Sequence, residues 1–126
     1  MLANARLQTI VCTTDIERSE PFYRDILGLK LKQQSEGAWV FDVGGAELRL
    51  SPVDSHTPGE HTLIGFAVAD LDAALDQLQD RGVEFERFDG LIQDARGVVN
   101  APGGARVAWL RDPDGNLMSV VEFAKD

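Results

Sequence analysis

The sequence predicts an α+β fold built from two tandem βαβββ modules, each in the order strand, helix and three further strands. Two internal repeats predict this organisation. Residues 39–50 and 109–120 each combine a tryptophan, a short apolar run, a glycine-containing turn and a second apolar strand, with an offset of 70 residues. Helical patterns that open at Asp15 and at Asp70 close at Gly28 and Gly82, with an offset of 55 residues. The repeats also indicate which positions of the two modules correspond.

Module one spans residues 6–51. Asp15 is suited to cap a helix, and the apolar positions that follow recur at helical spacing. Pro21 is tolerated only in the first turn, so this helix is expected to start near Ser19. Runs rich in β-branched and apolar residues predict strands, with Gly44 and Gly45 as the final turn: residues 6–13, 29–34, 37–43 and 46–51.

A linker rich in proline and glycine, residues 52–60, leads to module two, residues 61–123. Asp70 caps a helix that carries leucines on one face, and strands are expected at residues 61–69, 83–88, 105–111 and 117–123. The aspartates and glycine of residues 112–116 are typical of a tight structural turn. Module two has 15 more residues than module one, which we place in the irregular segment 89–104. This segment is either a specificity or lid loop or tolerated extra length.

Composition limits the class of protein. The chain of 126 residues is 44% hydrophobic, which fits a single domain over residues 1–126 with one core. No apolar run approaches the roughly 20 residues of a membrane helix. With a net charge of −9, nucleic acid is not an expected partner. One cysteine and the absence of a signal-peptide pattern favour a cytoplasmic location.

Three motifs in order, together with the paired modules, resemble the vicinal oxygen chelate superfamily. They are Phe-Tyr-Arg-Asp-Ile-Leu-Gly at 22–28, Val-Ala-Asp-Leu-Asp-Ala-Ala at 68–74 and Trp-Leu-Arg-Asp-Pro-Asp-Gly-Asn at 109–116. The superfamily includes glyoxalase I, bleomycin-resistance proteins, fosfomycin-resistance enzymes and extradiol dioxygenases. The resemblance covers residues 6–123 and implies that the modules form a curved mixed sheet, a cup that holds a ligand. It also implies a homodimer.

The resemblance further implies where the enzymes of this superfamily hold a divalent metal. Carried over from the motifs, the four positions are occupied here by Gln8, Arg49, Leu63 and Ser119. Leu63 has no lone pair to donate, and Arg49 is a permanent cation that repels a metal ion. No histidine or carboxylate stands in this set, so no metal cofactor is expected.

An alternative metal site arises if two strands slip by two residues. His61 lies two positions before Leu63, and Glu47 lies two positions before Arg49. With Gln8 they could form a shifted site of a glyoxalase-type lyase or a dioxygenase. Otherwise His61 is solvated at the mouth of its strand, and Glu47 pairs with Arg49 or with water.

Strand alternation predicts which side chains line the cup. Arg49 could clamp a carboxylate or phosphate, or pair with Glu47. Trp39 and Trp109, matched by the repeat, could stack on a planar ligand or belong to the core. Cys12 has no neighbouring base and is expected to be a small buried thiol. The complete candidate set is Gln8, Cys12, Trp39, Glu47, Arg49, Leu63, Trp109 and Ser119.

The function expected from these features is metal-independent binding of a small molecule, as in bleomycin-resistance proteins that sequester an antibiotic. No nucleophile–histidine constellation is visible, so catalysis is not favoured. Two alternatives stay open: a metal-dependent enzyme that uses the shifted site, and a dimeric interaction or regulatory module. The charge of the ligand also stays open, since the acidic chain favours a cation and Arg49 favours an anion.

Overall fold

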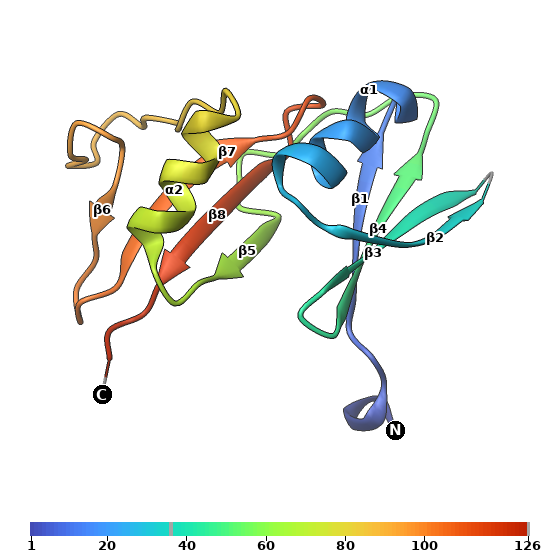
Figure 1. Ribbon diagram of the computed structural model, residues 1–126, viewed down its shortest axis with the longest axis horizontal. Helices are drawn as coiled ribbons and strands as arrows, with labels where there is room; N and C mark the ends of the chain where they lie inside the picture. Colours follow the sequence, from blue (N-terminus) through green and yellow to red (C-terminus); the bar gives the residue numbers. More distant parts are fainter. Residues whose placement is uncertain (36, 126) are drawn as a thin grey trace. The chain divides into compact units, whose positions relative to one another are not determined.

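The computed structural model describes residues 1–35 and 37–125. The chain divides into two compact units, Met1–Thr57 and Pro58–Asp126. The boundary falls inside the proline-rich segment that the composition identifies as a linker. Each unit contains one four-stranded sheet, coloured blue to green in the first unit and green to red in the second (Figure 1). Within the described part of the chain, no helix is both long and apolar enough to cross a membrane.

Unit 1 has the predicted strand–helix–strand–strand–strand order. After a short turn, η1 (Leu2–Asn4), its sheet has the strand order β1-β4-β3-β2. The outer strand β1 runs parallel to β4, and the other pairs are antiparallel. The elements are β1 (Gln8–Thr13), α1 (Ile16–Pro21), η2 (Phe22–Ile26), β2 (Lys30–Ser35), β3 (Ala38–Val43) and β4 (Ala46–Pro52).

The first helix begins earlier than expected, at Ile16. The carboxylate of Asp15 accepts a hydrogen bond of 3.3 Å from the backbone N–H of Arg18, so the cap itself is as predicted. Pro21 therefore lies at the end of α1 and not in its first turn. Because proline has no N–H to donate, the backbone widens beyond Pro21 into the π-helical turn η2. Gly28 ends the segment at a φ of 70°, where glycine carries no steric cost.

The helical segment covers one face of the sheet of unit 1. The ring of Tyr23 lies 6.1 Å from the ring of Phe41 on β3 and packs edge-on against Phe22. Phe41, Leu48 and Leu50 are buried on this face. The apolar alternates of each strand thus form the core, as the two-residue period predicts.

Unit 2 repeats the arrangement with strand order β5-β8-β7-β6 and with β5 parallel to β8. Its fourth strand differs from the prediction. Residues 83–88 form no strand and retain one backbone bond to β7, from Glu86 N to Trp109 O at 2.8 Å. The short β6 pairs with β7 instead, after the excursion of residues 89–98. The elements are β5 (Ile64–Ala67), α2 (Leu71–Asp80), β6 (Val99–Asn100), β7 (Arg106–Arg111) and β8 (Leu117–Glu122).

The two tryptophan-led hairpins are not in the same register, which corrects the repeat offset. Gly44 and Gly45 alone connect β3 to β4, whereas the β7–β8 turn closes with Asp112 N donating to Asn116 O across three residues. One additional turn residue shifts β7 by one position against β8. Trp39 therefore lies opposite Leu50, while Trp109 lies opposite Ser119. The two tryptophans are not equivalent and face opposite sides of their sheets.

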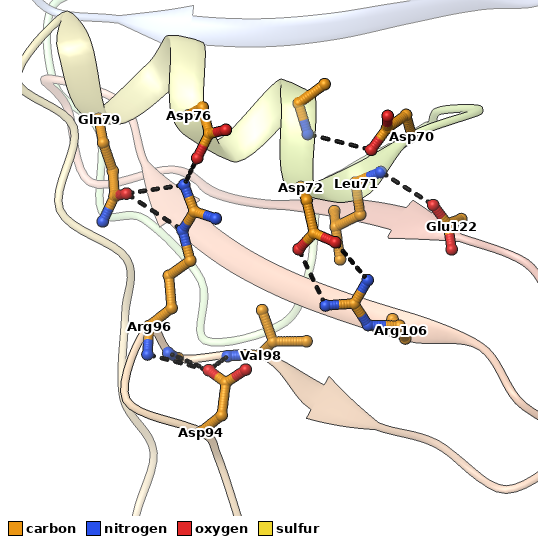
Figure 2. Close-up of polar contacts among 12 residues, drawn as sticks. Asp70, Leu71, Asp72, Asp76, Gln79, Asp94, Arg96, Val98, Arg106 and Glu122 are labelled. Carbon is orange, nitrogen blue, oxygen red and sulfur yellow. Dashed lines mark hydrogen bonds and ion pairs between the residues drawn. The ribbon is translucent and has the colours of Figure 1, made fainter.

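Polar side chains fix α2 to its surroundings (Figure 2). The Asp70 carboxylate caps the helix at Ala73 N, and Glu122 of β8 accepts a 3.0 Å bond from Leu71 N. Arg106 of β7 forms a two-pronged ion pair with Asp72, and the hydrogen bond from Arg106 holds the pKa of Asp72 below its ordinary value. This contact places Arg106, and every second residue of β7 after it, on the side of the sheet that faces α2.

Candidate functional site

The face of the unit 1 sheet that lies away from the helix, called here the open face, carries most of the predicted site residues. Cα partners across the sheet put Gln8 beside Glu47, Ile10 beside Arg49 and Cys12 beside Ser51. Partners across a ladder project to the same side. The open face is formed by Gln8, Ile10, Cys12, Val40, Asp42, Glu47, Arg49 and Ser51.

Glu47 is fully engaged by cations from outside its own strand. Its carboxylate lies 2.6 Å from Lys32 Nζ and 3.2 Å from Arg6 Nη1, and Gln8 Nε2 approaches to 3.4 Å. The hydrogen bond from Lys32, aided by the charge of Arg6, holds the pKa of Glu47 below its ordinary value against partial desolvation. The predicted pairing of Glu47 with Arg49 is therefore wrong.

A local irregularity of β2 explains why the sequence did not reveal these partners. The register of β2 against β3 shifts between Leu31 and Gln33, which is a β-bulge. Lys32 is the residue inside this irregularity, and its side chain reaches Glu47 two strands away. Strict alternation from Leu31 does not predict that position.

Arg49 stands out on the open face. Its side chain is half-buried, yet it makes no hydrogen bond or ion pair with any residue that the structure describes. Its neighbours across the ladders are the aliphatic side chains of Ile10 and Val40. A desolvated guanidinium group without a carboxylate partner is free to bind an anion.

The other two candidates of unit 1 have different surroundings. Cys12 is half-buried and lies in register with Ser51 on the open face, so it is not the fully buried thiol that was expected. Trp39 lies on the opposite side of the sheet, the side of Leu50 and Phe41. In unit 1, the tryptophan and Arg49 are thus on different faces.

In unit 2, Trp109 and Ser119 share the sheet face that lies away from α2. Trp109 Nε1 donates a 3.2 Å hydrogen bond to Thr62 Oγ1, and its ring packs edge-on against Phe88 at 5.4 Å. Ser119 is buried, and a Cβ atom at Gly65 would lie 3.1 Å from Ser119 Oγ. Sequence reasoning missed Thr62 and Phe88, because neither lies in a strand.

Leu63 and His61 precede β5, which begins at Ile64. Leu63 N still donates to Leu117 O at 2.8 Å, and its side chain is 39% exposed. His61 is exposed and lies over Gly59, where an added Cβ atom would be 2.8 Å from His61 Nδ1. The assumption that His61 continues the alternation of a strand from 61 to 69 is therefore incorrect.

A comparison with family models gives a match over residues 6–120 to the glyoxalase/bleomycin resistance protein/dioxygenase superfamily. The chain belongs to this superfamily. The uncharacterized protein YraH of Bacillus subtilis (strain 168) is 30% identical over 133 residues, covering 93% of this chain and 97% of that protein.

Solved structures of the superfamily share the fold of this chain. TnmS3, an antibiotic binding protein from Streptomyces sp. CB03234, is 27% identical with a TM-score of 0.73, covering 98% of this chain and 99% of its own. Lactoylglutathione lyase from Agrobacterium tumefaciens has a TM-score of 0.72 at 21% identity, covering 94% of this chain and 93% of its own. One fold thus carries both a binding protein and an enzyme.

The residues at the implied metal positions do not fit a divalent metal. Gln8 and Ser119 offer weak neutral oxygens, Leu63 offers none, and Arg49 brings a positive charge. At the shifted positions, the Glu47 carboxylate is occupied by Lys32 and Arg6. Among the described residues, no three His, Cys, Asp or Glu side chains are grouped as metal ligands.

Proposed function

We propose that this protein binds a small organic molecule without a metal ion, using the open sheet faces that carry Arg49 and Trp109. The observation that carries the proposal is the state of Arg49. It occupies a position where the superfamily's enzymes hold a metal ligand, and none of the described residues neutralises it. A cation at that position favours a ligand over a metal ion.

Two further features support binding. The open face of unit 1 mixes polar and aliphatic side chains, which is typical of small-molecule sites. TnmS3, 27% identical over nearly the full length, is an antibiotic binding protein. Sequestration of a small molecule in the cytoplasm by a homodimer is the complete form of the proposal, and light scattering of the purified protein measures the dimer.

The first experiment tests metal binding against metal-independent binding. Protein dialysed against a chelator is titrated with Ni²⁺, Zn²⁺, Mn²⁺ and Fe²⁺ in a calorimeter, with thermal unfolding measured in parallel. We expect no stoichiometric binding and no specific rise in the melting temperature. Stoichiometric binding that His61→Ala abolishes, and that the matched control His56→Ala retains, would establish the shifted metal site instead.

The second experiment tests ligand binding directly. Planar cations, carboxylates and neutral aromatic compounds are added to the metal-free protein, and Trp fluorescence and backbone NMR shifts are followed. We expect saturable binding by at least one class in the presence of chelator. Absence of any saturable change across the three classes contradicts the proposal and favours an interaction or regulatory module.

A further inference from the structure

The open face of unit 1 carries an excess of positive charge, although the chain as a whole has a net charge of −9. Arg49 is on this face, Lys32 and Arg6 reach it through Glu47, and Lys30 lies in register with Asp42. Against these four cations stand two carboxylates, Glu47 and Asp42. The electrostatic character of the described part of this face is therefore opposite to that of the chain.

Neither carboxylate neutralises Arg49. Glu47, two residues away on the same strand, is bound by Lys32 Nζ at 2.6 Å and by Arg6 Nη1 at 3.2 Å. Asp42 lies in register with Glu47, one step along from Arg49, and no ion pair joins it to Arg49. The positive charge left over on the face is thus concentrated at Arg49.

The position of Arg49 is also partly apolar. Ile10 is its partner across β1 and remains 55% exposed, although it is a large aliphatic residue in the middle of a strand. Val40 is its partner across β3 and is 9% exposed. A guanidinium group between two branched aliphatic side chains offers one charged contact and an adjoining apolar surface.

We propose that Arg49 binds the carboxylate of a small organic acid whose apolar part lies on Ile10 and Val40. This inference rests on the proposed ligand-binding function and names the chemical class of the ligand. The planar guanidinium fork matches the two oxygens of a carboxylate, and such charge-assisted pairs are stronger than neutral hydrogen bonds. The ligand is therefore an anion, although the acidic composition of the chain favours a cation.

The test compares three probes that share one ring system and differ in charge: 1-naphthoate, neutral 1-naphthamide and cationic 1-naphthylmethylamine. The full ¹⁵N-labelled chain is titrated with each, and the amide shifts of β1, β3 and β4 are followed. We expect 1-naphthoate to shift residues around Arg49 and to bind about tenfold more tightly than 1-naphthamide.

Substitutions at Arg49 give the specific readout. Arg49→Gln is expected to weaken 1-naphthoate about tenfold and to leave 1-naphthamide unchanged, because only the carboxylate contact is lost. Arg49→Lys should retain part of the preference, since it keeps the charge but not the planar fork. The matched control is Arg18→Gln, which removes one positive charge from the exposed side of α1. The amide spectrum of each variant reports whether it is folded.

The outcomes separate this inference from the proposed function. If 1-naphthylmethylamine or 1-naphthamide binds the open face as tightly as 1-naphthoate, ligand binding stands and the carboxylate assignment is wrong. The assignment is also wrong if Arg18→Gln weakens 1-naphthoate as much as Arg49→Gln does. If no probe shifts the open face at millimolar concentration, both the inference and the use of this face for binding are contradicted.

Discussion

At the scale of single residues, Glu47 and Arg49 show how two neighbours on one strand face can have different roles. Both project from β4 to the open face, and a direct ion pair between them is the simplest expectation. Lys32, displaced by the β-bulge, and Arg6 occupy the carboxylate instead. The two cations thereby leave Arg49 without a partner among the described residues, which is the property that the proposed function uses.

The ionisation of Glu47 tests this arrangement. Lys32→Gln removes the hydrogen bond that is the largest cause of the lowered pKa of Glu47, so that pKa is expected to rise toward its ordinary value. A ¹³C NMR titration of the Glu47 side-chain carboxyl measures it. Because folding lowers this pKa, the ion pairs stabilise the fold above the ordinary pKa of glutamate, and the stabilisation is lost as the pH falls through the lowered value.

Lys30→Gln is the matched control for Lys32→Gln. Lys30 is on the same strand, is exposed and carries the same charge, but it lies in register with Asp42. It should change the pKa of Glu47 much less. An equal rise in both variants would mean that general charge, and not the contact with Lys32, lowers this pKa.

At the scale of elements, residues 89–98 form an ordered excursion and not a loose insertion. Gln93 Oε1 accepts from Phe88 N, while its amide nitrogen donates to Glu86 O and Gly97 O. Arg96 binds Asp76 and Gln79 of α2, which fixes the excursion to that helix (Figure 2). The additional length of module two is thus a defined structure next to the edge of its sheet.

Asp94 closes this excursion, and its removal should open it locally. Asp94 Oδ1 accepts from the backbone N–H groups of Val98, Arg96 and Gly97, and these bonds, with that of Val98 the largest, lower the pKa of Asp94. In Asp94→Ala we expect faster amide hydrogen exchange at residues 96–98, with little change in β5 and β8. Asp94→Asn keeps an acceptor oxygen and should protect these amides better. Unchanged exchange in Asp94→Ala would show that the excursion is held by other contacts.

The N-terminal cap of α2 gives a second prediction at this scale. Asp70→Ala removes the 3.1 Å bond to Ala73 N and is expected to lower the free energy of unfolding by about 1 kcal/mol, measured by urea denaturation. Asp80→Ala, at the other end of α2, removes the same charge without removing a cap and should not destabilise. A loss in Asp80→Ala as large as that in Asp70→Ala would contradict the capping argument.

At the scale of the whole molecule, local chemistry explains what the sequence predicts correctly. The caps Asp15 and Asp70 and the two-glycine turn act over a few residues, so the order of elements in each unit follows from them. Alternation also placed Gln8, Glu47, Arg49 and Ser51 on one face, which the β1–β4 register confirms. The family match over residues 6–120 confirms the predicted superfamily.

The features that were missed depend on contacts between distant residues. The split edge strand of unit 2 depends on how residues 86 and 99–100 share β7, and the partners of Glu47 depend on a bulge one strand further out. The length of a turn decided the faces of Trp39 and Trp109, because a single residue reverses a strand. Composition and periodicity contain none of this information.

The corrected offset of 69 residues between β3 and β7 makes Phe41 the counterpart of Leu110, and both are 0% exposed. Each fills the helix-facing side of its own sheet, so Phe41→Ala and Leu110→Ala should each cost about 2–5 kcal/mol in urea unfolding. Asp42→Ala, the next residue on β3, points to the open face and should cost under about 0.5 kcal/mol. The uncorrected offset of 70 pairs Phe41 with Arg111, which bonds Glu86 on the other face. A small cost for Leu110→Ala beside a large cost for Phe41→Ala would therefore reject the register assigned to the second hairpin.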